Sequence, residues 1–202
     1  MSRAALRATA LLAPLALAAL AGCGGAPAAG RAPAPHVTPA SAAPAAAPTA
    51  DPMPASEPVR VRIPSAGVDA SPVLGLGLAA DGTVEVPSVA DADKIGWYTK
   101  GVTPGQTGPA VLIGHFDTAR GPAVLKDVSR VRTGEEITVS RADGTTAVFR
   151  VRELEQVGKN DFPTAKVYGD TARPELRVIT CGGELTDGHR PDNIILYADL
   201  VG

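Results

Sequence analysis

The chain has 202 residues, with 19 Lys and Arg, 21 Asp and Glu, and a formal net charge of −2. This near balance, together with an aromatic content of 3%, argues against a nucleic-acid surface or a stacking platform for bases or sugars. The 19 prolines are unevenly placed, which indicates that two kinds of chain are joined.

The first 23 residues have the layout of a bacterial export signal. Arg3 and Arg7 supply a positive start, and an uncharged Ala/Leu run follows over 8–21. The run ends in Leu20-Ala21-Gly22-Cys23, which resembles the lipobox of bacterial lipoproteins, where the cysteine thiol receives the lipid. We expect lipidation at Cys23; the alternative is an ordinary cleaved signal or an uncleaved anchor in which Cys23 is incidental.

Residues 24–57 are rich in Ala, Pro, Gly and Ser and hold almost no large apolar side chain. Such a segment cannot bury enough surface to offset its ordering entropy, so the composition predicts a disordered tether. His36 lies within it, and we assign that residue no role. The expected location is the extracytoplasmic face of the cell membrane, with the N-terminus, lipidated or uncleaved, as the anchor.

Residues 58–202 hold short β-branched runs separated by turn residues, the pattern of a folded β domain. Residues 123–131 have apolar side chains at helical spacing and predict one short helix, and a further helical turn is possible within 161–170. Many short strands with only one or two short helices predict an all-β, closed or nearly closed barrel. Strands are expected at 59–63, 84–86, 95–98, 110–114, 136–140, 146–157, 176–180 and 194–198.

Three apolar strands adjoin a reactive or charged residue. His115 follows the strand at 110–114, Cys181 follows the strand at 176–180, and Arg190 lies just before the strand at 194–198. If these strands are neighbours in the sheet, the three side chains converge at one edge. Thiol acyl transfer needs at least two groups: a thiolate that attacks the carbonyl, here Cys181, and an imidazolium that protonates the leaving amine, here His115. A guanidinium such as that of Arg190 can stabilise the oxyanion.

The number and spacing of the cysteines and histidines argue against a disulfide at Cys181 and against a metal site. An exported chain normally pairs its cysteines, but Cys23 lies beside the signal, which leaves Cys181 as an unpaired thiol. We expect no metal and no cofactor, because Cys181, His115 and His189 show no paired-ligand spacing. Asp117 could either orient the His115 imidazole or cap a turn, and Arg173 and Arg177 are most simply surface charges.

The chain resembles the sortases, cysteine transpeptidases of Gram-positive cell envelopes. The resemblance rests on Gly114-His115-Phe116-Asp117, on Val178-Ile179-Thr180-Cys181, on Arg190 before a terminal strand and on Gly134–Val139. Thr-Cys-Gly-Gly and the Arg-x-Asp-Asn-like ending are most similar to the class E/F group of high-GC bacteria. Arg177-Val178 stands where the family commonly has Thr-Leu.

The resemblance implies an eight-stranded barrel with His115 as acid and base, Cys181 as nucleophile, Arg190 as oxyanion or substrate stabiliser and Thr180 as an orienting or substrate-contact residue. It implies cleavage of a Leu-Pro-x-Thr-Gly-type sorting signal of secreted surface proteins and acyl transfer to an amine of peptidoglycan or pilin. The alternatives are an L,D-transpeptidase-like cell-wall enzyme, which also uses Cys and His, and a lipid-anchored binding module without catalysis.

Overall fold

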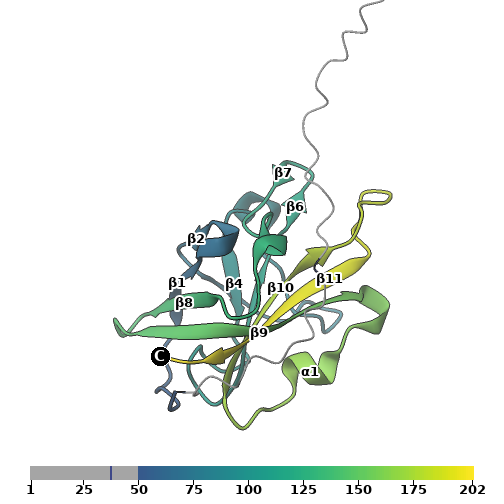
Figure 1. Cartoon of the computed structure of the whole chain (residues 1–202). Helices are drawn as coiled ribbons and strands as arrows, with labels where there is room; N and C mark the ends of the chain where they lie inside the picture. The colour runs from purple at the N-terminus through teal and green to yellow at the C-terminus, as the bar shows by residue number, and fades with distance from the viewer. Residues whose placement is uncertain (1–36, 38–49) are drawn as a thin grey trace, which may run out of the picture. The chain divides into compact units, whose positions relative to one another are not determined.

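The computed structural model describes residue 37 and residues 50–202 (Figure 1). The strands are β1 (Pro58–Ile63), β2 (Val68–Ala70), β3 (Leu74–Leu76), β4 (Ile95–Tyr98), β5 (Gly108–Gly114), β6 (Asp117–Thr118), β7 (Gly121–Pro122), β8 (Glu136–Arg141), β9 (Thr146–Gly158), β10 (Pro174–Gly182) and β11 (Asp192–Leu200). Short helices are the α-helix α1 (Thr164–Tyr168) and the 3-10 turns η1 (Pro64–Ala66), η2 (Val89–Asp91), η3 (Val128–Arg130) and η4 (Lys159–Asp161). The all-β prediction with a few short helices is confirmed.

The main sheet curls around the larger of two apolar clusters and has the strand order β2-β1-β8-β9-β11-β10-β5-β4-β3 (Figure 1). Its nine strands exceed the eight expected, because the short β2 and β3 extend its two ends. β10 lies between β5, to which it is parallel, and β11, to which it is antiparallel. The small β6–β7 hairpin stands apart from this sheet. The strands that end at His115 and Cys181 are therefore direct neighbours.

Both faces of β10 are buried, although its sequence contains Glu175, Arg177 and Thr180 besides the apolar residues. Leu176 and Val178 point into the main core, whereas Ile179 belongs to a second apolar cluster on the opposite face of the sheet. That cluster also contains Val167 of α1, so the chain between β9 and β10 covers it. Arg177, expected at the surface, is 1% exposed, because this covering segment was not evident from the local sequence.

Residues 123–131 form turns and η3 in place of the expected amphipathic helix. Their backbone N–H groups bond to other segments: Val124 donates to Ala92 and Leu125 to the carbonyl of His115. The apolar side chains still enter the core, as the fully buried Leu125 and Val131 show. Burial was predicted correctly here, but the local conformation was not, since tertiary contacts override helical propensity.

Ordered structure begins before Pro58. Residues 50–57, which the sequence assigns to the tether, lie against the domain through backbone bonds from Ala50 to Leu200 and from Met53 to Gly105. The predicted export signal, Cys23 and the tether up to residue 49, apart from Val37, lie outside the described residues. Within the part of the chain that the structure describes, no helix is long and apolar enough to cross a membrane.

Candidate active site

The ends of β5 and β10 bring His115 and Cys181 together. The parallel register pairs Ile113 with Ile179, and two residues further along each strand come His115 and Cys181. Side chains alternate between the two faces of a sheet, so both follow the face of Ile113 and Ile179. The sequence prediction that these two residues share one sheet edge is consistent with this register.

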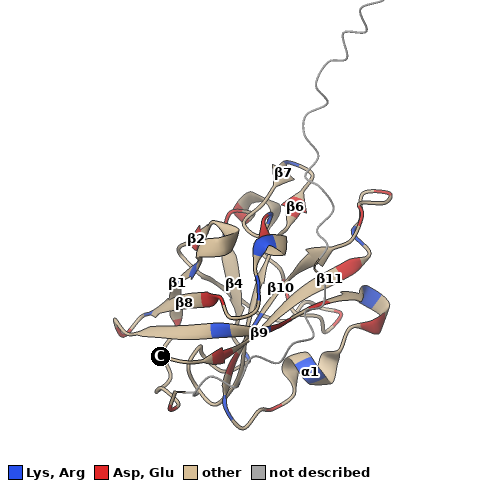
Figure 2. Cartoon of the chain, in the orientation of Figure 1, with Lys and Arg blue, Asp and Glu red and all other residues tan. Residues whose placement is uncertain are grey.

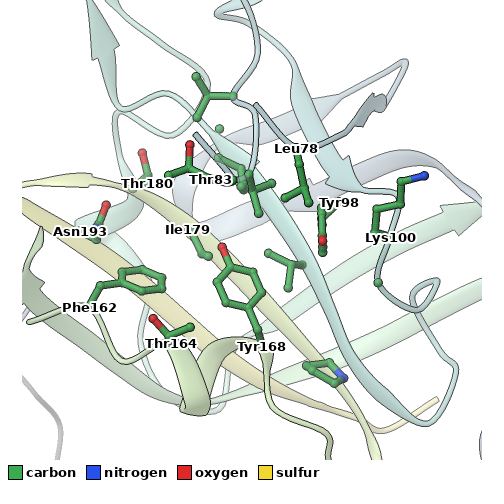
Figure 3. Close-up of a pocket in the computed structure, with 18 of the residues that line it drawn as sticks. Leu78, Thr83, Tyr98, Lys100, Phe162, Thr164, Tyr168, Ile179, Thr180 and Asn193 are labelled. Carbon is green, nitrogen blue, oxygen red and sulfur yellow. The ribbon is translucent and has the colours of Figure 1, made fainter. Parts of the chain in front are cut away.

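A cleft of about 1400 Å³ opens on this face, and Figure 3 shows side chains that line it. Its polar end contains His115, Thr180, Cys181 and Asn193. Its remaining wall is largely apolar, and it includes Leu78, Val84, Val86, Tyr98, Val111, Ile113, Phe162, Tyr168 and Ile179. A thiol and an imidazole at one end of an apolar cleft form a typical layout for an enzyme acting on an extended apolar ligand.

Three aromatic rings form one wall of the cleft (Figure 3). Tyr98 and Tyr168 meet edge to face with centroids 6.2 Å apart, and Phe162 lies 6.1 Å from Tyr168. Burial raises the pKa of the Tyr168 phenol, so this hydroxyl stays neutral over the physiological range. Phe162 and Tyr168 lie in the irregular segment before β10, where the sequence offered no periodic signal for a site.

The His115 imidazole is oriented by a backbone carbonyl. Its Nε2 lies 2.7 Å from the carbonyl oxygen of the buried Pro87. A carbonyl can only accept, so Nε2 must carry the proton and Nδ1 is the nitrogen left free in the neutral ring. Pro87 therefore performs the orienting function that the sequence offered to Asp117.

Cys181 is a free cysteine with intermediate exposure, open to the cleft at the end of β10. The preceding Thr180 is 3% exposed, and its Oγ1 has no hydrogen-bond partner within the described residues. A buried hydroxyl without a partner costs free energy, and such groups call for an explanation. One explanation is a partner that arrives with a ligand, since Thr180 also lines the cleft.

Arg190 is close to the site in sequence and in space, but its guanidinium binds other groups. Its Nε and Nη2 donate to the two carboxylate oxygens of Asp117 at 3.0 and 2.7 Å, and its Nη1 donates to the carbonyl of Gly183. The guanidinium also stacks 4.6 Å above the Phe116 ring. Arg190 is not among the residues that line the cleft, and its guanidinium is held beside the site by Asp117 and Gly183.

A charged network lies on the same face of β10 as Ile179, beneath the segment that carries α1. Arg177 and Arg152 each donate to Oε2 of Glu175 at 2.7 Å. Burial alone would raise the pKa of Glu175, but the hydrogen bonds from Arg177 and Arg152 hold it below its ordinary value. Beside them, Tyr197 donates to Glu155 at 2.6 Å, and burial and this bond raise the pKa of its phenol strongly.

Elsewhere, acidic and basic residues are interspersed over the described elements (Figure 2). No group of three or more His, Cys, Asp or Glu side chains suited to a metal ion occurs in residues 37 and 50–202. His189 is exposed in the loop between β10 and β11.

A family model, described as the Sortase domain, matches residues 61–201. The chain belongs to the sortase family. Sortases are cysteine transpeptidases, and this chain is an enzyme of that kind. A comparison with curated proteins finds no match.

Solved sortase structures share the fold at low sequence identity. Sortase C-1 from Actinomyces oris is 21% identical, with a TM-score of 0.55, over 72% of this chain and 76% of that one. The sortase D5 transpeptidase of Clostridium perfringens is 18% identical, with a TM-score of 0.52, over 72% and 79%. Sortase A from Corynebacterium diphtheriae is 18% identical, with a TM-score of 0.54, over 73% and 62%.

Proposed function

We propose that this sortase cleaves a Leu-Pro-x-Thr-Gly-type sorting signal through a thioacyl intermediate on Cys181 and transfers the acyl group to an amine of the cell envelope. The observation that carries the proposal is the meeting of Cys181 and His115, from two adjacent parallel strands, at one end of an apolar cleft. The class E/F assignment belongs to the same proposal and rests on Thr-Cys-Gly-Gly and the residues before β11.

The steps follow from the orientation of His115. Nδ1 takes the thiol proton, the thiolate attacks the peptide carbonyl, and a tetrahedral intermediate forms. The same Nδ1 then gives its proton to the departing amine as the carbon–nitrogen bond breaks, which leaves a thioester on Cys181. The acceptor amine attacks that thioester and restores the free thiol. Throughout, the carbonyl of Pro87 holds Nε2–H and keeps the ring in place.

The cleft suits the apolar part of such a signal. Leu78 and Val86 line it and are 50% and 56% exposed, which leaves apolar surface for a bound peptide to cover. At the polar end, Thr180 lines the cleft, but its unpartnered Oγ1 is buried, so a local rearrangement would have to precede any contact with a peptide group of the substrate. The role of Arg190 as oxyanion or substrate stabiliser remains a sequence prediction.

The proposed partners are the sorting signals of secreted surface proteins and an amine of peptidoglycan or pilin. The proposed location is the extracytoplasmic face of the membrane. The export signal at 1–23 would direct the chain there, and the N-terminus, lipidated at Cys23 or left uncleaved, would anchor it. The tether that follows would connect this anchor to the domain. Intact-mass analysis of a membrane extract would distinguish a lipid on Cys23 from an uncleaved signal.

The test of the reaction is mass spectrometry of the protein incubated with a library of sorting-signal peptides. We expect an acyl adduct on Cys181, and no adduct or cleavage with a folded Cys181→Ala variant. Peptide cleavage by that variant would contradict the proposal. Turnover of muropeptide stems, without any reaction of sorting peptides, would favour an L,D-transpeptidase-like activity. A thiol that fails to react with a methanethiosulfonate reagent would favour a binding module.

A further inference from the structure

We infer that the end of the cleft remote from Cys181 is a second binding site, formed by Lys100, Gln106 and Asp170, for the residues that precede the leucine of the sorting signal. The inference rests on the proposed thiol acyl transfer and adds to it the length and the polar character of the substrate. It is drawn from the extent of the cleft along β5 and from the unpaired polar groups that the described residues place at its far end.

The cleft follows one face of β5 over the length of the strand. Pro109, Val111 and Ile113 line it in alternation, and His115 follows on the same face, at the end where Cys181 lies. At about 3.3 Å per residue, the chain from Pro109 to His115 spans roughly 20 Å. An extended acyl group of four residues, Leu-Pro-x-Thr, covers only about 13 Å of this distance. About two further residues of a substrate therefore fit between the leucine and the far end.

A pair of tyrosines lies at the middle of this length. β4 is antiparallel to β5, and the register places Tyr98 at the level of Val111. The Tyr98 ring contacts Tyr168, with centroids 6.2 Å apart. The distance along the strand from Val111 to His115 is about 13 Å, the same as the length of the four-residue acyl group. When the threonine carbonyl lies at the thiol, the leucine of the signal therefore reaches the two rings.

The acyl side of the substrate is the side that lies along the cleft. During transfer, the leaving amine departs and the acceptor amine enters while the acyl group stays on Cys181. Both amines need access from solvent, which the largely exposed loop between β10 and β11 provides at the thiol end. The acyl chain then runs back along β5, away from that loop.

Lys100 lies at the far end, where β5 begins. A Cβ on Gly101 would lie 3.9 Å from the carbonyl oxygen of Pro109, so the turn that carries Lys100 is next to the start of β5. Figure 3 shows Lys100 on one side of the Tyr168 ring and Asn193 of the thiol end on the other.

Gln106 and Asp170 reach the same end from two other segments. Gln106 precedes the first residue of β5, Gly108, by two positions. The N–H of Gly108 donates to the carbonyl of Arg173 at 3.2 Å, which holds the chain between α1 and β10, with Asp170, against the start of β5. The far end is therefore built from three separate loops.

All three side chains line the cleft and have polar atoms free for a ligand. Lys100 and Asp170 are exposed and form no ion pair or side-chain hydrogen bond within residues 37 and 50–202. Gln106 accepts the N–H of Thr103 at 2.8 Å, and because a backbone N–H can only donate, this contact is made by Oε1. Both Nε2–H donors are left without an acceptor in the described chain. Ammonium and amide groups donate to peptide carbonyls, and the carboxylate accepts from a peptide N–H.

The experiment compares acetylated Leu-Pro-Ala-Thr-Gly amide with the same peptide preceded by Ala-Ala, Glu-Glu or Lys-Lys. The readout is kcat/KM for cleavage, with hydroxylamine as the acceptor amine. The extended peptides are expected to react about three- to tenfold faster than the short one, because the two added residues form hydrogen bonds at the far end. Two residues added after the glycine instead are expected to give no such gain.

Lys100→Glu tests where the extension binds. The ratio of kcat/KM between the Lys-Lys and Glu-Glu peptides is expected to rise about three- to tenfold, because the reversed charge attracts the one and repels the other. The matched control is Lys159→Glu. Lys159 is exposed and lines the same cleft, but it follows Gly158, which pairs with Asp192 near the thiol. Its distance from the far end exceeds the Debye length of about 8 Å at physiological salt, so this variant should change both values by the same factor.

Equal kcat/KM for the short peptide and the three extended peptides would overturn the inference. An unchanged charge ratio in Lys100→Glu, or a gain only from residues added after the glycine, would also overturn it. In each of these cases a sorting peptide is still cleaved, so the proposed function stands and the inference alone fails. If no peptide is cleaved, the proposed function fails, and the inference on the far end fails with it.

Discussion

Arg190 and Asp117 form a two-point ion pair that joins the loop after β10 to the hairpin strand β6, which begins two residues after His115. The hydrogen bonds measure 3.0 and 2.7 Å, and the arginine side chain is 3% exposed, against 21% for the aspartate. Parallel bonds of this kind fix geometry as well as contribute free energy, because both groups are planar. The pair therefore sets how the Cys181 strand end and the His115 strand end face each other.

Removal of one partner is expected to destabilise the protein. Arg190→Ala leaves a poorly solvated carboxylate, so the free energy of unfolding should fall by about 3 kcal/mol. Asp117→Ala should have a similar effect, and the double variant should lose less than the sum of the two. Chemical denaturation of the four proteins measures this coupling. Strictly additive losses would show that the two side chains do not interact in solution.

The turn after Cys181 depends on glycine at position 183. Gly183 has φ +79°, and a Cβ there would lie 2.9 Å from Oδ2 of Asp192. Gly188 has nearly the same φ, +80°, but a Cβ there would meet nothing within 4 Å. Gly183→Ala is therefore expected to lower the free energy of unfolding by about 2–3 kcal/mol, and Gly188→Ala by about 1 kcal/mol. Equal losses would indicate that the backbone conformation alone is responsible.

The sequence located His115 and Cys181 because each follows an apolar run, and such runs form adjacent central strands. It did not indicate Asn193, since only the register of β10 and β11 shows that this residue lies directly opposite Cys181. Because successive side chains point to opposite faces of a strand, a shift of one residue in the pairing would move a side chain to the other face of the sheet. No local pattern could have shown that Asp117 binds Arg190, 73 residues away, and not the imidazole two residues before it.

Local sequence also failed to predict what packs against β10. Arg177 was expected at the surface because a charged residue usually is, and the segment that buries it belongs to the irregular chain around α1. Likewise, the Asp81-Gly82 turn leads only into an isolated bridge between Leu78 and Val84, and not into the expected strand. Long-range packing decides both outcomes.

Thr180→Val is expected to affect the free energy of unfolding and the acylation of Cys181 in different ways. Valine has the same shape and removes a buried hydroxyl that lacks a partner within the described chain, so the free energy of unfolding should stay equal or rise by about 1 kcal/mol. If the hydroxyl binds the substrate, acylation of Cys181 by a sorting peptide should fall about three- to tenfold. Denaturation and adduct kinetics measure the two effects, with methanethiosulfonate labelling as the control for the thiol. Unchanged acylation would show that Thr180 makes no substrate contact.

Glu175 is expected to make the fold sensitive to acid. Its pKa is lower in the folded chain than its ordinary value of 4.5, so the unfolded state binds the proton first. The stabilisation is complete above that ordinary pKa and is lost as the pH falls through the lower folded pKa. Glu175→Gln should lose roughly 3 kcal/mol at pH 7 and show a weaker further loss between pH 5 and pH 3 than wild type. The exposed Glu184→Gln is the control, and identical pH profiles for wild type and Glu175→Gln would contradict the assignment.

The N-terminal segment at 50–57 is expected to be part of the stable domain. Met53 packs against the main core, Ser56 N–H donates to Thr103 at 3.0 Å, and the fully buried guanidinium of Arg141 donates to the carbonyl of Pro54. A chain that begins at Pro58 loses these contacts and leaves the Arg141 side chain, which has no other hydrogen-bond acceptor in the described residues, with only the distant Asp143 carboxylate. Its free energy of unfolding should be about 3 kcal/mol lower than that of a chain that begins at Ala50, which corresponds to a melting temperature roughly 6–12 °C lower. Equal melting temperatures for the two chains would place the domain boundary at Pro58, as the proline content alone suggests.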